Sequence, residues 1–206
     1  MFDRFMPPTV LAIAGLAACS PMGDYQPRDG DVIFQTSRSS QSQAIQLATK
    51  SPYSHMGIVY VREGGEALVF EAVQPVKLTP LSEWVSRGEG RHFVAKRLVD
   101  ADTLLTPEKL AKMKQVGESF AGRDYDLFFE WTDDRMYCSE LVWKIFDRGA
   151  GIDIGDLETL GDFDLSHPAV EAKLRERFGD RLRLEEAVIS PDAMFRSERL
   201  ETVYEY

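Results

Sequence analysis

The sequence predicts an α+β fold in which a mainly antiparallel sheet packs beside helices. Short β-branched and aromatic runs are interspersed with segments whose apolar residues recur at helical spacing. A glycine-rich turn joins two of the apolar runs into a hairpin. The 206 residues are 44% hydrophobic and 28% charged, which is typical of one globular domain with appendages. This composition excludes disordered, collagen-like and polytopic membrane chains.

Five segments have the composition of strands. The expected strands cover residues 31–35, 55–62, 67–73, 91–98 and 201–206. Glycine adopts positive φ at little cost, so Gly64 and Gly65 are expected to form the turn between the second and third strands. Counting back from this turn places Val59 and Tyr60 roughly opposite residues 69–70, with an uncertainty of two residues in the register.

Helical spacing and helix-start signals mark the other elements. The expected helices cover residues 39–49, 79–87, 106–122 and 138–148. Thr79-Pro80 and Thr106-Pro107 combine a capping residue with a proline at the first helical position. Gly149 is expected to end the last of these helices. The charged stretch over residues 171–183 alternates in sign, which indicates a solvated helix face.

The charge balance argues against a nucleic-acid partner. The chain has 34 acidic and 24 basic residues, for a formal net charge of −10. Phosphate binding needs a local excess of lysine and arginine, and no run of five basic residues is present. No phosphate loop, dinucleotide fingerprint or paired metal-ligand spacing is present either, so no cofactor or metal is expected.

The N-terminus has the composition of a targeting segment. Arg4 precedes an apolar run, Val10 to Ala18, that is too short for the ~20 residues of a membrane span but fits the apolar region of a signal peptide. Leu16-Ala17-Ala18-Cys19 resembles a bacterial lipobox, which implies lipidation of Cys19 and cleavage before it. The alternatives are a plain signal peptide or a core helix that ends in cysteine.

The lipobox interpretation divides the chain into three parts. Residues 1–18 are a lipoprotein signal peptide, residues 19–29 a tether, and residues 30–206 the folded domain. The protein would then be lipid-anchored at the periplasmic face of a bacterial cell envelope. Ser20, rather than aspartate, follows the lipidated cysteine, and by resemblance to enterobacterial sorting rules this favours the outer membrane.

Cys138 is the first candidate for chemistry. It is one of only two cysteines and stands where a helical pattern begins. A thiol in the first turn of a helix meets unpaired N–H groups and the positive end of the helix dipole, which favour the nucleophilic thiolate. The alternative is a buried, inert cysteine. A disulfide to Cys19 is formally possible, but separate roles for the two cysteines argue against it.

His55 and Glu71 complete a candidate site. A neutral imidazole beside a thiol can take its proton and later protonate the leaving group. His55 opens a strand, whereas His92 and His167 have no comparable setting. A carboxylate in an otherwise apolar strand is unusual, and Glu71 is therefore the candidate that orients His55. An outward-facing Glu71, with Gln74 as the orienting residue, is the alternative.

The order of these motifs resembles a known family. Residues 30–33, 54–59, 71 and 137–142, followed by Ser190-Pro191-Asp192, are similar to the circularly permuted NlpC-type papain-fold hydrolases of the YiiX-like group, in which the histidine precedes the cysteine. The resemblance implies a permuted papain-like fold with Cys138 as nucleophile, His55 as general base and Glu71 as third member. Tyr137 would shape the oxyanion site, where the Cys138 N–H is a natural donor.

The resemblance also implies a function. We expect a thiol hydrolase of an amide bond, acting on a peptidoglycan peptide or a related small amide. One alternative is a lipid-directed thiol enzyme like lecithin:retinol acyltransferase, although the second histidine typical of those enzymes and a membrane-docking segment beyond the anchor are missing. A non-catalytic binding lipoprotein is another alternative, and the intact Cys/His pair argues against it.

Overall fold

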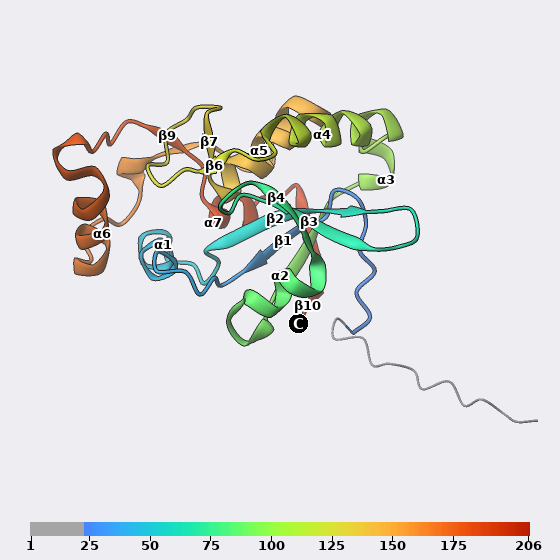
Figure 1. Ribbon diagram of the computed structural model, residues 1–206, viewed down its shortest axis with the longest axis horizontal. Coiled ribbons are helices and arrows are strands. Elements are labelled where there is room, and N and C mark those ends of the chain that lie inside the picture. Colours follow the sequence, from blue (N-terminus) through green and yellow to red (C-terminus); the bar gives the residue numbers. More distant parts are fainter. Residues whose placement is uncertain (1–22) are drawn as a thin grey trace, which may run out of the picture.

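The computed structural model describes residues 23–206, so the expected signal peptide and Cys19 lie outside the described residues. A six-stranded sheet with the order β10-β5-β1-β2-β3-β4 forms the centre of the domain (Figure 1). All neighbouring strands in this sheet are antiparallel. The α+β class with a mainly antiparallel sheet is thereby confirmed.

The elements follow one another as strands and helices mixed along the chain. The strands are β1 Val32–Gln35, β2 His55–Val61, β3 Ala67–Glu71, β4 Lys77–Pro80, β5 Val94–Leu98, β6 Asp124–Tyr125, β7 Arg135–Met136, β8 Glu158–Thr159, β9 Ala187–Val188 and β10 Leu200–Glu205. The α-helices are α1 Ser42–Thr49, α2 Leu81–Arg87, α3 Ala101–Leu104, α4 Pro107–Phe120, α5 Cys138–Ala150, α6 Pro168–Phe178 and α7 Pro191–Phe195.

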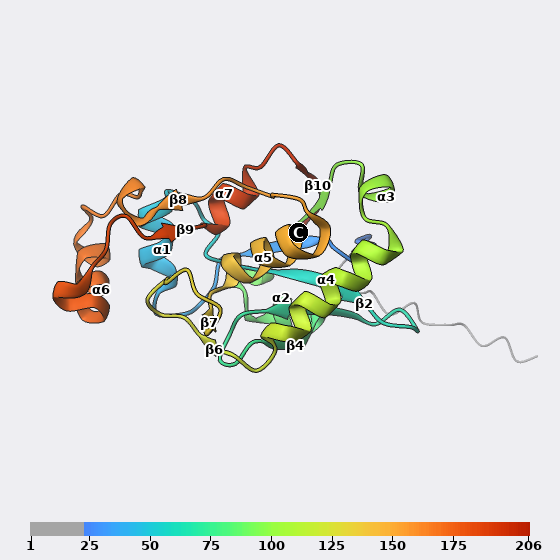
Figure 2. The ribbon, with the colours of Figure 1, turned by 90° about the horizontal axis from the view of Figure 1, so that it is seen from above.

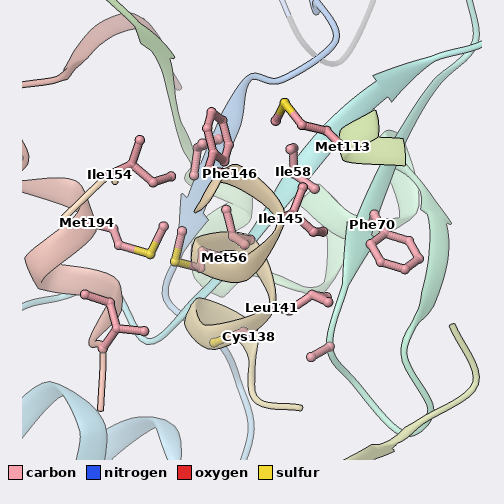
Figure 3. Close-up of a cluster of buried hydrophobic side chains, with 14 of the residues drawn as sticks. Met56, Ile58, Phe70, Met113, Cys138, Leu141, Ile145, Phe146, Ile154 and Met194 are labelled. Carbon is pink, nitrogen blue, oxygen red and sulfur yellow. The ribbon is translucent and has the colours of Figure 1, made fainter. Parts of the chain in front are cut away.

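Each face of the sheet buries its own apolar cluster, as strand alternation requires. On one face, α4 and α5 lie side by side over the strands (Figure 2). There Leu141, Ile145 and Phe146 of α5 pack against Met56 and other side chains of the sheet (Figure 3). On the other face α2 contributes a fully buried Trp84. Helix α5 is thus held along its length, which positions its first residue, Cys138.

The capping chemistry explains where several helices begin. Thr106 accepts a hydrogen bond from the N–H of Lys109 at 3.4 Å, and Pro107 follows it, as the sequence predicts. Ser190 likewise accepts from the N–H of Ala193 and begins α7.

Several element boundaries differ from the sequence prediction: α1 begins at Ser42 and β5 at Val94, three residues later than expected. Two further differences have a clear physical reason. Gly149 lies inside α5 rather than ending it, because its missing side chain lets the helix pack against Met113 of α4, and Gly151 at φ 67° is the actual C-cap. Residues 77–80 form an edge strand that the sequence does not reveal, since Thr79-Pro80 ends this strand as well as preceding α2.

The expected tether packs on the domain over its second half. Tyr25 is buried against Phe93 and Tyr204, and its hydroxyl donates to Asp31 at 2.9 Å. Asp31 is itself held by Arg97 at 2.6 Å. Within the described residues, contacts with the folded domain therefore already occur at Tyr25, before Gly30. Within the described residues, no helix has both the length and the apolar character needed to cross a membrane.

Candidate active site

Cys138 is the first residue of α5 and is 3% exposed. The backbone N–H of Tyr137 donates to the carboxylate of Glu140 at 3.4 Å, which forms part of a capping box around this end of the helix. The hydroxyl of Ser139 donates to the carbonyl of Ile189 at 2.7 Å. The chain just before α7 therefore lies against the N-terminus of α5 and fixes the cysteine.

Tyr137 sits beside the cysteine with its side chain turned into the protein. Its hydroxyl accepts the N–H of Ile189 at 3.2 Å, and its ring meets Phe129 edge to face. Burial raises the pKa of this hydroxyl well above its usual range. Tyr137 thus holds residue 189 against the start of α5, next to Cys138.

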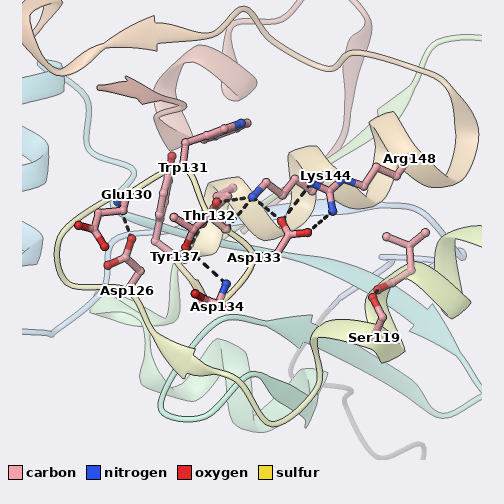
Figure 4. A network of polar contacts seen from close by, with 12 residues as sticks. Ser119, Asp126, Glu130, Trp131, Thr132, Asp133, Asp134, Tyr137, Lys144 and Arg148 are labelled. Atoms are coloured by element: carbon pink, nitrogen blue, oxygen red, sulfur yellow. Dashed lines mark hydrogen bonds and ion pairs between the residues drawn. The ribbon is translucent and has the colours of Figure 1, made fainter. Parts of the chain in front are cut away.

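A buried ion pair supports the same end of α5. The Nζ of Lys144 donates to Glu140 at 2.6 Å. It also donates to Asp133 at 2.9 Å and to the carbonyl of Thr132 at 2.7 Å (Figure 4). Arg148 adds a second contact to Asp133 at 2.7 Å. These bonds tie the loop before β7 to the helix that carries Cys138.

His55 and Glu71 meet across the β2–β3 hairpin. The Nε2 of His55 lies 2.6 Å from the Oε2 of Glu71, although the two residues are not directly cross-strand. Val59 pairs with Val69 and Tyr60 with Leu68, which agrees with the predicted register within its uncertainty of two residues. This register places Glu71 beside Gly57, two residues along from His55. The ring of His55 stacks on Trp84 with centroids 6.0 Å apart.

Glu71 is fully buried and held as a carboxylate. Burial alone raises its pKa, but hydrogen bonds from His55 and Thr79 and the charge of Arg87 lower the pKa below its usual value. Its Oε1 accepts from Thr79 at 2.6 Å and from Arg87. Neither Thr79 nor Arg87 is identified from the sequence, because both read there as parts of a helix start and a helix end.

Cys138 and Glu71 both raise the pKa of His55. Burial lowers this pKa, but hydrogen bonds to Cys138 and Glu71 and their negative charges outweigh it and raise the pKa to about 9. Because Glu71 engages Nε2, Nδ1 is the nitrogen left for the thiol. Because this pKa is raised, it contributes stability that is fully present below the ordinary histidine pKa of 6.5 and is lost as the pH rises through about 9.

Gln74 is occupied elsewhere. Its amide nitrogen donates to Asp124 at 2.5 Å, and its amide oxygen accepts the N–H of Tyr125 at 2.8 Å. The structure therefore brings together Cys138, His55 and Glu71, and keeps Gln74 outside this group.

Replacing Glu71 by glutamine is expected to lower the pKa of His55 by at least about one unit, because a charge that favours imidazolium is lost. Turnover should fall by about 10²-fold, less than for loss of the cysteine. A histidine NMR titration and an activity assay measure both effects. Glu66→Gln, in the exposed hairpin, is the control. An unchanged titration and full activity would remove Glu71 from the site.

The absence of a side chain at Gly57 leaves room for the neighbouring strand that carries Glu71. A Cβ at this position would lie 2.4 Å from Val69 Cγ1 and 3.0 Å from the Phe70 carbonyl. Gly57→Ala should therefore cost about 1–3 kcal/mol in the free energy of unfolding, together with activity.

The matched control for this change is Gly117→Ala in α4, where the nearest atom would be 3.3 Å away on a side chain and helix propensity favours alanine. Denaturant unfolding compares the two variants. Equal stabilities for both would contradict the close packing at Gly57.

An apolar cavity of about 100 Å³ opens beside Cys138, between α1, α6 and the N-terminus of α5. Helices α1 and α6 lie next to each other in both views (Figures 1 and 2). The apolar lining includes Ile45, Phe129, Leu174, Phe178 and Val188. Engineered apolar cavities of ~150 Å³ bind benzene, so this smaller one suits a short acyl chain rather than a ring.

Three polar side chains separate this cavity from a groove on the His55 side. Gln41, Tyr125 and Arg177 line both spaces. The amide of Gln41 donates to the Tyr125 hydroxyl at 2.7 Å and accepts from Arg177 at 2.5 Å. Burial and the nearby charge of Cys138 raise the pKa of Tyr125. Sequence reasoning misses all three residues, because they come from separate segments with no shared motif.

A strand-borne histidine that precedes a helix-borne cysteine, on this sheet, is the arrangement of circularly permuted papain-like proteins. Residues 26–204 match the family described as permuted papain-like amidase enzyme, YaeF/YiiX, C92 family, and the chain belongs to it. The fold expected from the resemblance is confirmed. Family membership supports a cysteine hydrolase in general.

Two similar proteins extend the comparison. The uncharacterized protein YiiX of Escherichia coli (strain K12) is 46% identical over 193 residues, which are 94% of each chain. The crystal structure titled metalloprotein yiiX from Escherichia coli O157:H7 has a TM-score of 0.83 and 47% identity, and covers 88% of this chain and 99% of that one.

The residues of this site do not fit a resident metal. In the part of the chain that the structure describes, no three histidine, cysteine, aspartate or glutamate side chains gather closely enough to hold an ion. Both carboxylate oxygens of Glu71 are already hydrogen-bonded, to His55, Thr79 and Arg87.

Proposed function

We propose that this chain is a thiol hydrolase that cleaves an amide bond of a cell-wall peptide or a related small amide, using Cys138, His55 and Glu71. The observation that carries the proposal is the position of His55. Its Nε2 lies 2.6 Å from the buried Glu71 carboxylate, and Cys138 raises its pKa together with Glu71. A thiol, a base and a residue that orients the base are the parts that nucleophilic catalysis needs.

The reaction proceeds in two balanced steps. His55 takes the thiol proton, the sulfur of Cys138 attacks the amide carbon, and the C–N bond breaks as the amine leaves with the proton from His55. Water then attacks the thioester and gives its proton to His55, and the acid leaves while the thiol takes the proton back. The N–H of Cys138, in the first turn of α5, stabilises the oxyanion in both steps.

A substrate panel tests this function. Muropeptides and phospholipids are incubated with wild type and with Cys138→Ala, and the products are identified by mass spectrometry. The proposal expects an amine and an acid from a peptide amide with wild type alone. Cleavage that persists in Cys138→Ala, or no cleavage of any amide, contradicts it.

The apolar cavity favours a second candidate, a lipid-directed thiol enzyme. A cavity beside the nucleophile that accepts a short acyl chain suits acyl transfer from a lipid to Cys138. In the same panel, this candidate predicts loss of an acyl chain from phospholipid and an acylated Cys138, with the muropeptides unchanged.

The proposed location is the periplasmic face of the cell envelope, through lipid at Cys19. Cys19→Ser should abolish lipid labelling and leave the protein soluble or unprocessed, as measured by labelled-lipid uptake and membrane fractionation. Lipid uptake and membrane partitioning that persist in Cys19→Ser would show that the lipobox interpretation is wrong. A Cys19–Cys138 disulfide in the mature protein would contradict both cysteine assignments.

A further inference from the structure

The groove on the His55 side carries basic charge in an acidic protein. It has a volume of about 850 Å³, and its charged lining consists of Arg38, Arg87 and Arg177 together with His55. No aspartate or glutamate belongs to the lining. Because the chain as a whole carries a net charge of −10, composition alone would favour carboxylates here.

The three arginines differ in what neutralises them. Arg87 pairs with Glu71, so its charge is matched within the protein. Among the side chains that the structure describes, no carboxylate lies within ion-pair distance of Arg38 or Arg177. These two guanidinium groups have charge available for a ligand.

Arg177 is partly buried although its bonded partners are neutral. It donates to the amide oxygen of Gln41 at 2.5 Å and to the carbonyl of Leu127 at 3.3 Å. Taking a charge out of water without an opposite charge is unfavourable. A carboxylate or phosphate bound in the groove would offset this cost with charge-assisted hydrogen bonds.

The groove and the apolar cavity meet at Arg177, so an anion bound here lies near Cys138. We propose that Arg38 and Arg177 bind an anionic group of the substrate, a carboxylate or a phosphate, while the apolar part of its acyl portion enters the cavity beside Cys138. The proposal rests on the proposed function and narrows its substrates to anionic ones.

The test compares two alkylating agents of nearly equal size on the full-length protein. Iodoacetate carries a carboxylate and iodoacetamide is neutral, and peptide mapping by mass spectrometry gives the rate of each at Cys138. The ratio of the iodoacetate rate to the iodoacetamide rate should fall about threefold to tenfold in Arg38→Ala and in Arg177→Ala. High salt should lower the wild-type ratio.

Matched variants separate charge from packing. Arg62→Ala removes an arginine of the exposed β2–β3 hairpin and should leave the ratio unchanged. Arg177→Lys keeps the charge without the planar fork and should retain a ratio above that of Arg177→Ala. Arg38 is exposed and lies outside α6. Arg38→Ala therefore tests the charge without disturbing the packing of α6, even where the Arg177 variants shift that helix.

Competition distinguishes the two sources of negative charge. If acetate protects Cys138 from iodoacetamide better than inorganic phosphate does, the substrate carries a carboxylate. If phosphate protects better, the substrate carries a phosphate. An unchanged ratio in Arg38→Ala and Arg177→Ala overturns the anion site, while rapid iodoacetamide labelling leaves the hydrolase standing. If iodoacetamide reacts with Cys138 no faster than with a free thiol, the proposed function fails, and the anion site with it.

Discussion

Cys138→Ala and His55→Ala are each expected to abolish hydrolysis, and the double variant is expected to be little worse than either. The sulfur is the attacking atom, and His55 both removes its proton and protonates the amine. Loss of either member should therefore lower kcat by about 10⁴-fold or more. The measurement is single-turnover hydrolysis of the substrate found in the panel.

The fold should survive these changes. Cys138→Ala removes one buried atom and should alter the free energy of unfolding by no more than about 1–2 kcal/mol. In His55→Ala the Glu71 carboxylate keeps its hydrogen bonds from Thr79 and Arg87. Losses that multiply in the double variant would contradict a shared role, because residues that act as a unit do not contribute independently.

Lys144→Met is expected to cause the largest loss of stability, about 3–5 kcal/mol at pH 8. The Lys144 side chain is 2% exposed and that of Glu140 is fully buried, so the variant leaves a buried carboxylate without its cation. The measurement is urea unfolding. Lys50→Met, in an exposed pair with Asp164, is the control and should cost less than about 1 kcal/mol.

The Lys144–Glu140 pair makes the stability of the fold depend on pH. Burial raises the pKa of Glu140 to about 8 even though Lys144 lowers it. Because this lies above the ordinary value of 4.5, the associated stability is present below pH 4.5 and is lost as the pH rises through 8. Lys144→Met should therefore cost more at pH 8 than at pH 6. Adding Glu140→Gln should restore most of the loss, and a failure to do so would contradict the pairing.

The local parts of the fold could be predicted because their signals lie in adjacent residues. The β2–β3 register follows from the length of the Gly64-Gly65 turn, and α4 follows from Thr106-Pro107. Gly149 misled the prediction because its role is set by Met113 on another helix. A glycine that ends a helix and a glycine that lets two helices pack closely cannot be told apart in a single sequence.

Some residues of the candidate site could likewise be predicted from the sequence, and others could not. His55, Glu71 and Cys138 are unusual residues for their positions in strands and at a helix start, so the sequence points to each of them. Arg87 and Arg177 are ordinary charged helix residues in the sequence, and only the approach of α2 and α6 to the site shows what they contact. Long-range contacts of this kind leave no local pattern.

If Cys138, His55 and Glu71 form one reacting unit, the rate at which iodoacetamide labels Cys138 at pH 6 should depend on all three residues. An ordinary thiol with a pKa of ~8.5 hardly reacts at this pH. We expect rapid labelling in wild type, slower labelling in Glu71→Gln, and labelling at least about tenfold slower than wild type in His55→Ala. Equal rates in wild type and His55→Ala would contradict a single reacting unit.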